Sequence, residues 1–243
     1  MNRWIVYALL GLVALAGFAA AAAPARLIYE LAVRPSGIEA GLVHGTVWDA
    51  EARRVRAAGL RLAEAEARLH AAPLLTGRAV MDVALIDPAL RGAGRVTMSP
   101  GRTVIENATG VLGLDAVPAL AAADLPPGQS ARIEIDRLEL GPQGRCLSAA
   151  GRVTSAALVA AGEQYGAALP ALTADLACAG DAVALDFEGR GETLDLSGRV
   201  RLMADGPQWR IVGRTRDRDI IAALSLMGFS QSGPDEFIAE STP

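Results

Sequence analysis

The sequence contains no lysine, because all 23 of its basic residues are arginine. This absence excludes a phosphate-binding loop of the G-x-x-x-x-G-K-[ST] kind. Proteins that bind nucleic acid present a strongly basic face, whereas the formal net charge of this chain is −4. Nucleic acid is therefore not an expected partner.

Histidine is also scarce, with His44 and His70 as the two examples. Neither lies in an H-E-x-x-H motif, and two histidines in separate segments do not make a zinc site. The sequence has no G-x-S-x-G nucleophile elbow, and its acidic residues are spread along the chain rather than clustered. We therefore expect no enzymatic activity, no bound metal and no cofactor.

The sequence does contain one long apolar run. Residues 4–23 contain no charge, proline or amide, and a helix of this length spans roughly 30 Å, the thickness of a bilayer core. The only charged groups before the run are Arg3 and the amino terminus, and both are positive. The positive-inside rule therefore predicts a cytoplasmic segment over residues 1–3, a single span over 4–23 and a periplasmic remainder. A signal peptide cleaved near Ala23 is the alternative, and the length of the run favours an inner-membrane anchor.

The only two cysteines, Cys146 and Cys178, fall in the exported part. An isolated pair in an oxidising compartment usually forms a disulfide. Closing a loop of this size stabilises a fold by roughly 3.5–4 kcal/mol on the chain-entropy model. A thiol–disulfide catalyst needs a close pair such as Cys-x-x-Cys, so the wide spacing favours a structural bond.

The exported part is predicted to be mainly β. Residues 24–36 are expected to form a juxtamembrane linker, either a short helix or an interfacial continuation of the anchor. From residue 37 to 243 apolar and polar residues alternate, most clearly over 55–62, 80–85, 133–140, 183–187 and 194–202. Short strands joined by Gly/Pro turns indicate an antiparallel periplasmic β-domain, either an open, curled sheet or a sandwich.

Two helices and one closing strand complete the predicted elements. Residues 117–124 are expected to form one or two turns. Residues 216–227 form the strongest helical pattern, with Ile220, Ala223, Leu224 and Met227 on one face. Asp217 or Asp219 is the expected cap, Gly228 the expected stop, and residues 236–240 the last strand.

A weak internal repeat occurs within the β-region. The tripeptide Gly-Arg-Val begins apparent strands at Gly94, Gly151 and Gly198. Two related halves, over about 40–115 and 145–215, would explain the recurrence. Chance in a chain rich in arginine and glycine is the alternative, because no fixed period emerges.

Several short motifs follow one another in a fixed order along the chain. They are Gly45-Thr46-Val47-Trp48, then Pro73-Leu74-Leu75-Thr76-Gly77, then the strands after Cys178, and finally Leu224 to Gly228. This ordered set resembles the type II secretion system protein N family. That family places G-x-V-W soon after a single anchor, then P-x-x-L-L-x-G, then repeated G-x-V strands and a helix closed by glycine. The likeness covers nearly the whole chain.

The resemblance implies an accessory inner-membrane component of the type II secretion system. Such a protein would be a non-catalytic periplasmic adaptor for the export of folded proteins across the outer membrane. Its expected partners are other inner-membrane or periplasm-spanning components of the machine, together with membrane lipid. Trp48 is then either an interface anchor or a core residue of the first strand, and the core interpretation is favoured.

A different function remains open on the sequence alone. A membrane-anchored, curled sheet with an apolar face resembles AsmA-like envelope proteins, which bind or transfer lipid. Alternating strands fit an apolar trough, but they fit an ordinary packed core equally well. The sequence does not specify the oligomeric state.

Overall fold

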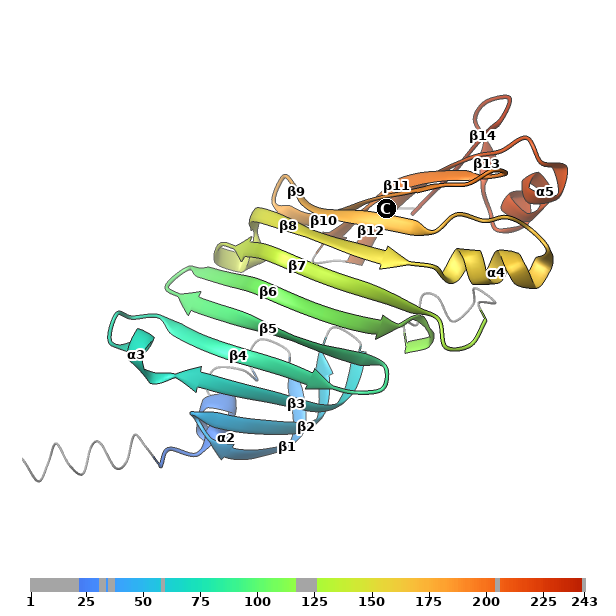
Figure 1. Cartoon of the computed structure of the whole chain (residues 1–243). Helices are drawn as coiled ribbons and strands as arrows, with labels where there is room; N and C mark the ends of the chain where they lie inside the picture. The colour runs from blue at the N-terminus through green and yellow to red at the C-terminus, as the bar shows by residue number, and fades with distance from the viewer. Residues whose placement is uncertain are drawn as a thin grey trace, which may run out of the picture. The chain divides into compact units, whose positions relative to one another are not determined.

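The computed structural model describes residues 22–30, 34, 38–57, 60–116, 126–203 and 206–241 (Figure 1). The predicted cytoplasmic segment and nearly all of the predicted span over 4–23 lie outside these residues, as does the helix expected over 117–124. Within the described ranges, no helix has the length and apolar character needed to cross a membrane. The anchor and the periplasmic location therefore stay predictions.

The chain divides into two compact units, with the boundary between Asp87 and Pro88. This boundary falls inside the first of the two proposed related halves. The three Gly-Arg-Val tripeptides all lie in the second unit, in its first, fourth and seventh strands. They thus recur at every third strand, and the duplication itself stays a prediction.

The first unit is an antiparallel meander, in which each strand pairs with its neighbours in sequence. Its elements are α2 (Ala25–Ile28), β1 (Glu39–Thr46), β2 (Asp49–Ala57), β3 (Leu60–His70), α3 (Ala71–Leu74) and β4 (Ala79–Ile86). The alternating segment over 55–62 is not continuous, because β2 ends at Ala57 and β3 begins at Leu60. Val55 and Leu62 are cross-strand partners, and both are buried. The alternation of apolar and polar residues is therefore continuous in the sequence although a turn interrupts it.

The second unit continues the same plan with ten described strands. Its strands are β5 (Leu90–Ser99), β6 (Arg102–Gly113), β7 (Ser130–Leu140), β8 (Cys146–Ser155), β9 (Leu172–Ala179), β10 (Ala182–Arg190), β11 (Asp195–Met203), β12 (Gly206–Arg214), β13 (Ser230–Gln231) and β14 (Glu236–Glu240). Its helices are η3 (Leu114–Ala116), η5 (Pro142–Gly144), α4 (Ala157–Tyr165) and α5 (Arg218–Leu226). Strands β5 to β12 follow in order, then β14, with β13 outermost.

The predicted antiparallel β-architecture is confirmed. The clearest predicted strand, over 133–140, lies within β7, and the closing strand over 236–240 is β14. The described strands of the second unit form one open sheet, not the two facing sheets of a sandwich.

The predicted C-terminal helix is α5, and it covers the main hydrophobic core. The Asp217 carboxylate accepts hydrogen bonds from the amides of Asp219 and Ile220, at 2.9 and 3.2 Å, which satisfies two free donors at the helix start. Ile220 and Leu224 pack with Leu194 and Phe237, and all four are buried.

Of the four residues predicted for the apolar face of α5, only Ile220 and Leu224 are buried. Met227 is 66% exposed and Ala223 is also exposed, whereas Ile221 packs against the core instead. Met227 is the residue after the last helical one, and Gly228 follows it with φ of +88°. The chain therefore leaves the helix before the side chain at position 227 can reach the core.

Helix α4 was not predicted. Its sequence, ALVAAGEQY, has little contrast between apolar and polar faces, so helical periodicity is weak. Small side chains explain why it still packs closely, since Ala157 and Ala161 are buried. Gly166 ends the helix in the left-handed conformation, with φ of +69°.

Candidate functional site

The Gly45-Thr46-Val47-Trp48 motif forms the tip of the β1–β2 hairpin. Thr46 pairs with Asp49, so Val47 and Trp48 are the two turn residues. Gly45 has φ of +85°, and a Cβ atom there would lie 2.2 Å from the carbonyl oxygen of Asp49. Only glycine fits this approach without a backbone shift. Trp48 is half-buried, and it lies in the turn after the first strand rather than within that strand.

The residues that follow the predicted anchor are bound to this hairpin. The Val47 amide donates to the carbonyl of Ala23 at 3.0 Å, and Pro24 forms a β-bridge with Thr46. The Tyr29 hydroxyl accepts from the Ala40 amide at 2.6 Å and donates to the Ile38 carbonyl at 3.3 Å. The start of the expected linker is therefore part of the first unit, because backbone bonds and a tyrosine hold it to β1.

The second motif, Pro73 to Gly77, forms α3 and the turn after it. The amides of Thr76 and Arg78 both donate to the Pro73 carbonyl, at 3.0 and 3.1 Å. Strands β1 and β3 run in the same direction, so their ends place this turn beside the Val47–Trp48 turn. The Leu69 amide, near the end of β3, donates to the Trp48 carbonyl at 3.1 Å and so holds the hairpin turn to the strand that leads into α3. Two motifs that are distant in sequence thus share one end of the first unit.

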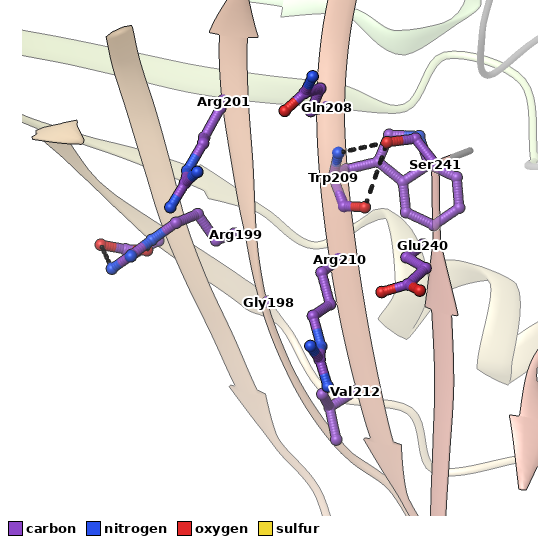
Figure 2. A pocket seen from close by; sticks show the side chains of 10 residues that line it. Gly198, Arg199, Arg201, Gln208, Trp209, Arg210, Val212, Glu240 and Ser241 are labelled. Atoms are coloured by element: carbon purple, nitrogen blue, oxygen red, sulfur yellow. Dashed lines mark hydrogen bonds and ion pairs between the residues drawn. The ribbon is translucent and has the colours of Figure 1, made fainter. Parts of the chain in front are cut away.

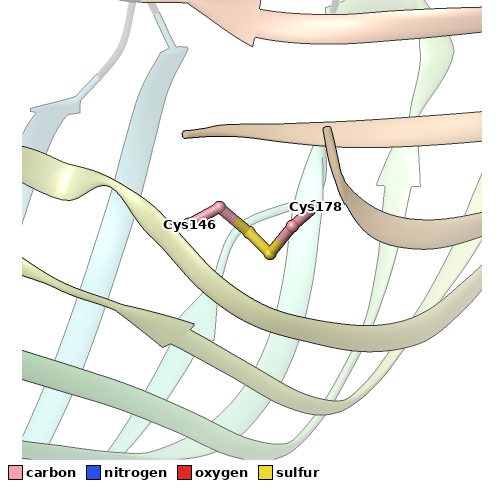
Figure 3. The surroundings of a disulfide bond; sticks show 2 residues. All are labelled: Cys146 and Cys178. Carbon is pink, nitrogen blue, oxygen red and sulfur yellow. A yellow bond between two sulfur atoms is a disulfide. The ribbon is translucent and has the colours of Figure 1, made fainter. Parts of the chain in front are cut away.

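The predicted disulfide between Cys146 and Cys178 is present (Figure 3). Strands β8 and β9 pair only over residues 152–155 and 172–175, and no ladder is found along the rest of their described length. Beyond that ladder the bond joins the two strands with a Cα–Cα distance of 5.6 Å. The Cys146 amide also donates to the Asp181 carbonyl at 2.7 Å. The disulfide therefore holds together two strands that are otherwise paired at one end only.

An arginine-rich cavity of about 690 Å³ opens on β10, β11, β12 and β14 in the second unit (Figure 2). It is defined by Asp186, Gly198, Arg199, Arg201, Gln208, Trp209, Arg210, Val212, Glu240 and Ser241, and we call it the arginine cavity. Arg199 lies directly opposite Arg210 across the β11–β12 ladder, and Arg201 lies opposite Gln208. Figure 2 shows Arg199 and Arg201 extending from β11 in the same direction, with Arg210 on the neighbouring strand.

The positive charge of the arginine cavity is only partly compensated. Arg199 donates two hydrogen bonds to the carboxylate of Asp186, one of them at 2.9 Å. These bonds hold the pKa of Asp186 below its ordinary value, and Arg201 adds to the effect through its charge. The side chains of Arg201 and Arg210, by contrast, have no hydrogen bond or ion pair within the described ranges.

Like charges directly opposite each other on neighbouring strands are destabilising. The Arg199–Arg210 pair carries such a cost. Asp186 opposite Arg199 and Glu240 opposite Arg210 reduce that cost, and an anion in the arginine cavity would relieve it further. A guanidinium group presents a planar set of donors that matches a carboxylate. The site is thus suited to an acidic side chain or another anion.

The Asp186–Arg199 pair predicts a specific pH dependence of stability. Because the pKa of Asp186 is lowered in the folded state, the pair stabilises the fold above about pH 4 and loses this contribution as the pH falls through the lowered pKa. Asp186→Asn should therefore lower the melting temperature slightly at neutral pH and have no effect in strong acid. Asp181→Asn, at an exposed turn, is the control and should show no such difference. Equal effects of both variants at every pH would contradict the prediction.

Sequence reasoning did not identify the arginine cavity. The sequence marks Gly198-Arg199-Val200 only as a possible repeat within an alternating segment. The cavity depends on strand register, which places Arg210 opposite Arg199 and Glu240 opposite Arg210. The one available signal was the arginine pair at alternate positions, and such a pair usually marks a solvated strand face.

A family model described as type II secretion system (T2SS), protein N, matches residues 36–237. The matched range contains both motifs of the first unit, the disulfide and most of the arginine cavity. No curated protein and no solved structure matches the chain.

Proposed function

The chain belongs to the type II secretion system protein N family, and on that premise we propose that it is an accessory inner-membrane component of the type II secretion system. In this role it is a non-catalytic periplasmic adaptor for the export of folded proteins across the outer membrane. Its partner is another inner-membrane or periplasm-spanning component of the same machine.

The arginine cavity is the observation that carries the adaptor role. Arg201 and Arg210 bring positive charge that Asp186 and Glu240 do not fully balance, because three arginines face two acidic residues there. Charge complementarity steers association and fixes the orientation of a complex. Arginine and tryptophan are also enriched among the residues that dominate binding energy at interfaces, and Trp209 lines the same cavity. An acidic segment of the partner fits this site.

The AsmA-like alternative requires an apolar trough for acyl chains. The arginine cavity is lined mainly by charged and polar side chains, with Trp209 and Val212 as its large apolar members. Such a lining suits an anionic group rather than a lipid tail. We therefore do not extend the proposal to lipid transfer.

Reversal of charge in the arginine cavity tests the adaptor role. We expect the full-length protein, tagged at its C-terminus and extracted in mild detergent, to co-purify with platform or periplasm-spanning components of the secretion machine. Arg201→Glu combined with Arg210→Glu should reduce that recovery by about tenfold or more, since tenfold corresponds to roughly 1.4 kcal/mol. The recovered proteins are identified and quantified by mass spectrometry.

Arg132→Glu is the matched control for this experiment. Arg132 is an exposed strand arginine on β7, outside the arginine cavity, so the control should retain the complex. Recovery of no secretion component with the unaltered protein would contradict the adaptor role. Equal recovery with the double variant and the control would retain the role but remove the arginine cavity from it.

A further inference from the structure

The end of the first unit at which β1 and β3 terminate lies where the chain leaves the predicted span. The span is predicted to end at Ala23, and the Ala23 carbonyl is bonded to the amide of Val47 in the hairpin turn. The headgroup layer extends several ångströms beyond the hydrocarbon core on each side, since the whole bilayer measures about 40–45 Å against roughly 30 Å for the core. With the span in its predicted position, the Val47–Trp48 turn lies within the depth of that layer.

Apolar side chains are exposed at this end of the unit. Leu75 is 91% exposed at the end of α3, Leu74 is 39% exposed, and Leu27 on α2 is 58% exposed. Figure 1 shows α2 and α3 at the same end of the strands of the first unit. Leu75 follows a helix of a single turn, so its exposure is not explained by packing within the unit. An isolated exposed leucine is unremarkable, but here three exposed leucines lie at the end of the unit where the chain enters it.

Exposed cations flank these leucines. Arg26 lies beside Leu27, and Arg78 lies three residues after Leu75 with its Nε atom bonded to the Thr76 hydroxyl at 3.3 Å. The nearby carboxylates are already engaged, because Glu30 binds Arg34 at 2.7 Å and Asp49 lies 3.7 Å from Arg68. Cations above an apolar tip suit the bilayer interface, where they meet lipid phosphates while leucines enter the acyl boundary.

We propose that this end of the first unit, formed by α2, the Val47–Trp48 turn and the α3 turn, docks on the outer surface of the inner-membrane bilayer, with Leu74 and Leu75 inserted at the level of the headgroups. The inference rests on the proposed inner-membrane location and adds a second membrane contact to it. The contact fixes the orientation of the first unit relative to the bilayer. A single span alone would leave that orientation free to rotate.

Depth measurements with nitroxide labels test the docking. The full-length protein is placed in nanodiscs of phosphatidylethanolamine and phosphatidylglycerol, and single Leu75→Cys, Ile86→Cys and Leu12→Cys variants are spin-labelled. The native cysteines form a disulfide and do not react with the label. Ile86 is the matched control, an apolar residue 44% exposed at the opposite end of β4, roughly 23 Å from its start. Relative collision rates with oxygen and with a water-soluble nickel chelate report lipid exposure.

The expected result is a several-fold higher ratio of oxygen to nickel accessibility at position 75 than at position 86, with the highest ratio at position 12. Equal, water-like ratios at positions 75 and 86, with position 12 in lipid, would overturn the docking and leave the anchored location intact. A water-like ratio at position 12 would overturn the anchored location, and with it the basis of the docking. The substituted side chains at positions 75 and 86 are exposed, so neither change is expected to disturb the fold.

Discussion

Phe237→Ala should lower the free energy of unfolding of the second unit by about 3–5 kcal/mol, the range found for removing a buried aromatic ring. Phe237 is 2% exposed and packs with Leu194, Ile220 and Leu224. The ring fills the space between β14 and α5. The side chains around it lie on separate parts of the fold, so they cannot all shift to fill the space that the ring would leave. The substitution therefore leaves a cavity in addition to the lost transfer free energy. Urea unfolding followed by circular dichroism measures the change.

Phe237→Leu is the matched control for this loss. Leucine keeps most of the apolar volume, so the cost should be well below that of alanine. A loss below about 1 kcal/mol for Phe237→Ala would show that the α5 core contributes little to stability. Removal of the α5 cap by Asp217→Ala would then be the remaining way in which a substitution in this region could lower the free energy of unfolding.

Removal of the disulfide is the second large effect. Cys146→Ser combined with Cys178→Ser should lower the free energy of unfolding by roughly 3.5–4 kcal/mol, because the unfolded chain loses a constraint across a sequence separation of 32 residues. In the folded state, loss of the bond should also loosen the β8–β9 junction locally, since β8 and β9 pair through only four residues each. Amide hydrogen exchange should become faster in the unpaired parts of both strands.

A reducing agent supplies the control for this prediction. Dithiothreitol should shift the urea midpoint of the unaltered protein toward that of the double serine variant and leave the variant unchanged. If reduction changes neither the midpoint nor the exchange rates near Cys146 and Cys178, the bond is not needed to hold β8 to β9. Serine is close to cysteine in size, so the double variant removes the bond with little change in side-chain volume.

The fold could be predicted where local chemistry determines local structure. The alternation over 133–140 identified β7 because each second side chain faces the same side of a strand. Asp217 was one of the two expected caps, with Asp219, because a short acceptor side chain before an apolar helix satisfies free amides. The Cys146–Cys178 bond followed from the absence of any other partner in an exported chain.

The parts that could not be predicted depend on packing or register. Helix α4 holds its place through small alanines that fit closely, and such residues carry no strong amphipathic signal. Met227 matched the helical period but lies past the end of α5, which only the position of the turn at Gly228 decides. Arg199 and Arg210 belong to separate strands, and their meeting depends on where the β11–β12 hairpin turns. Trp48 was expected at the first strand, yet it lies in the turn after that strand, next to Gly45 with its positive φ.

The neighbour-to-neighbour order of the strands affects how the chain can fold. Within each unit, from β1 to β4 and from β5 to β12, every strand pairs with the one before it. Most closing loops are therefore short and cost little entropy, and the longest run only from Gly113 to Ser130 and from Ser155 to Leu172. A chain delivered amino end first can therefore add one strand at a time to an existing edge, without waiting for a distant partner. The β8–β9 junction is the exception, because its covalent bond forms only after Cys178 has arrived. Elsewhere the chain can fold while it is being delivered. The strand added last then always forms the exposed edge of the sheet.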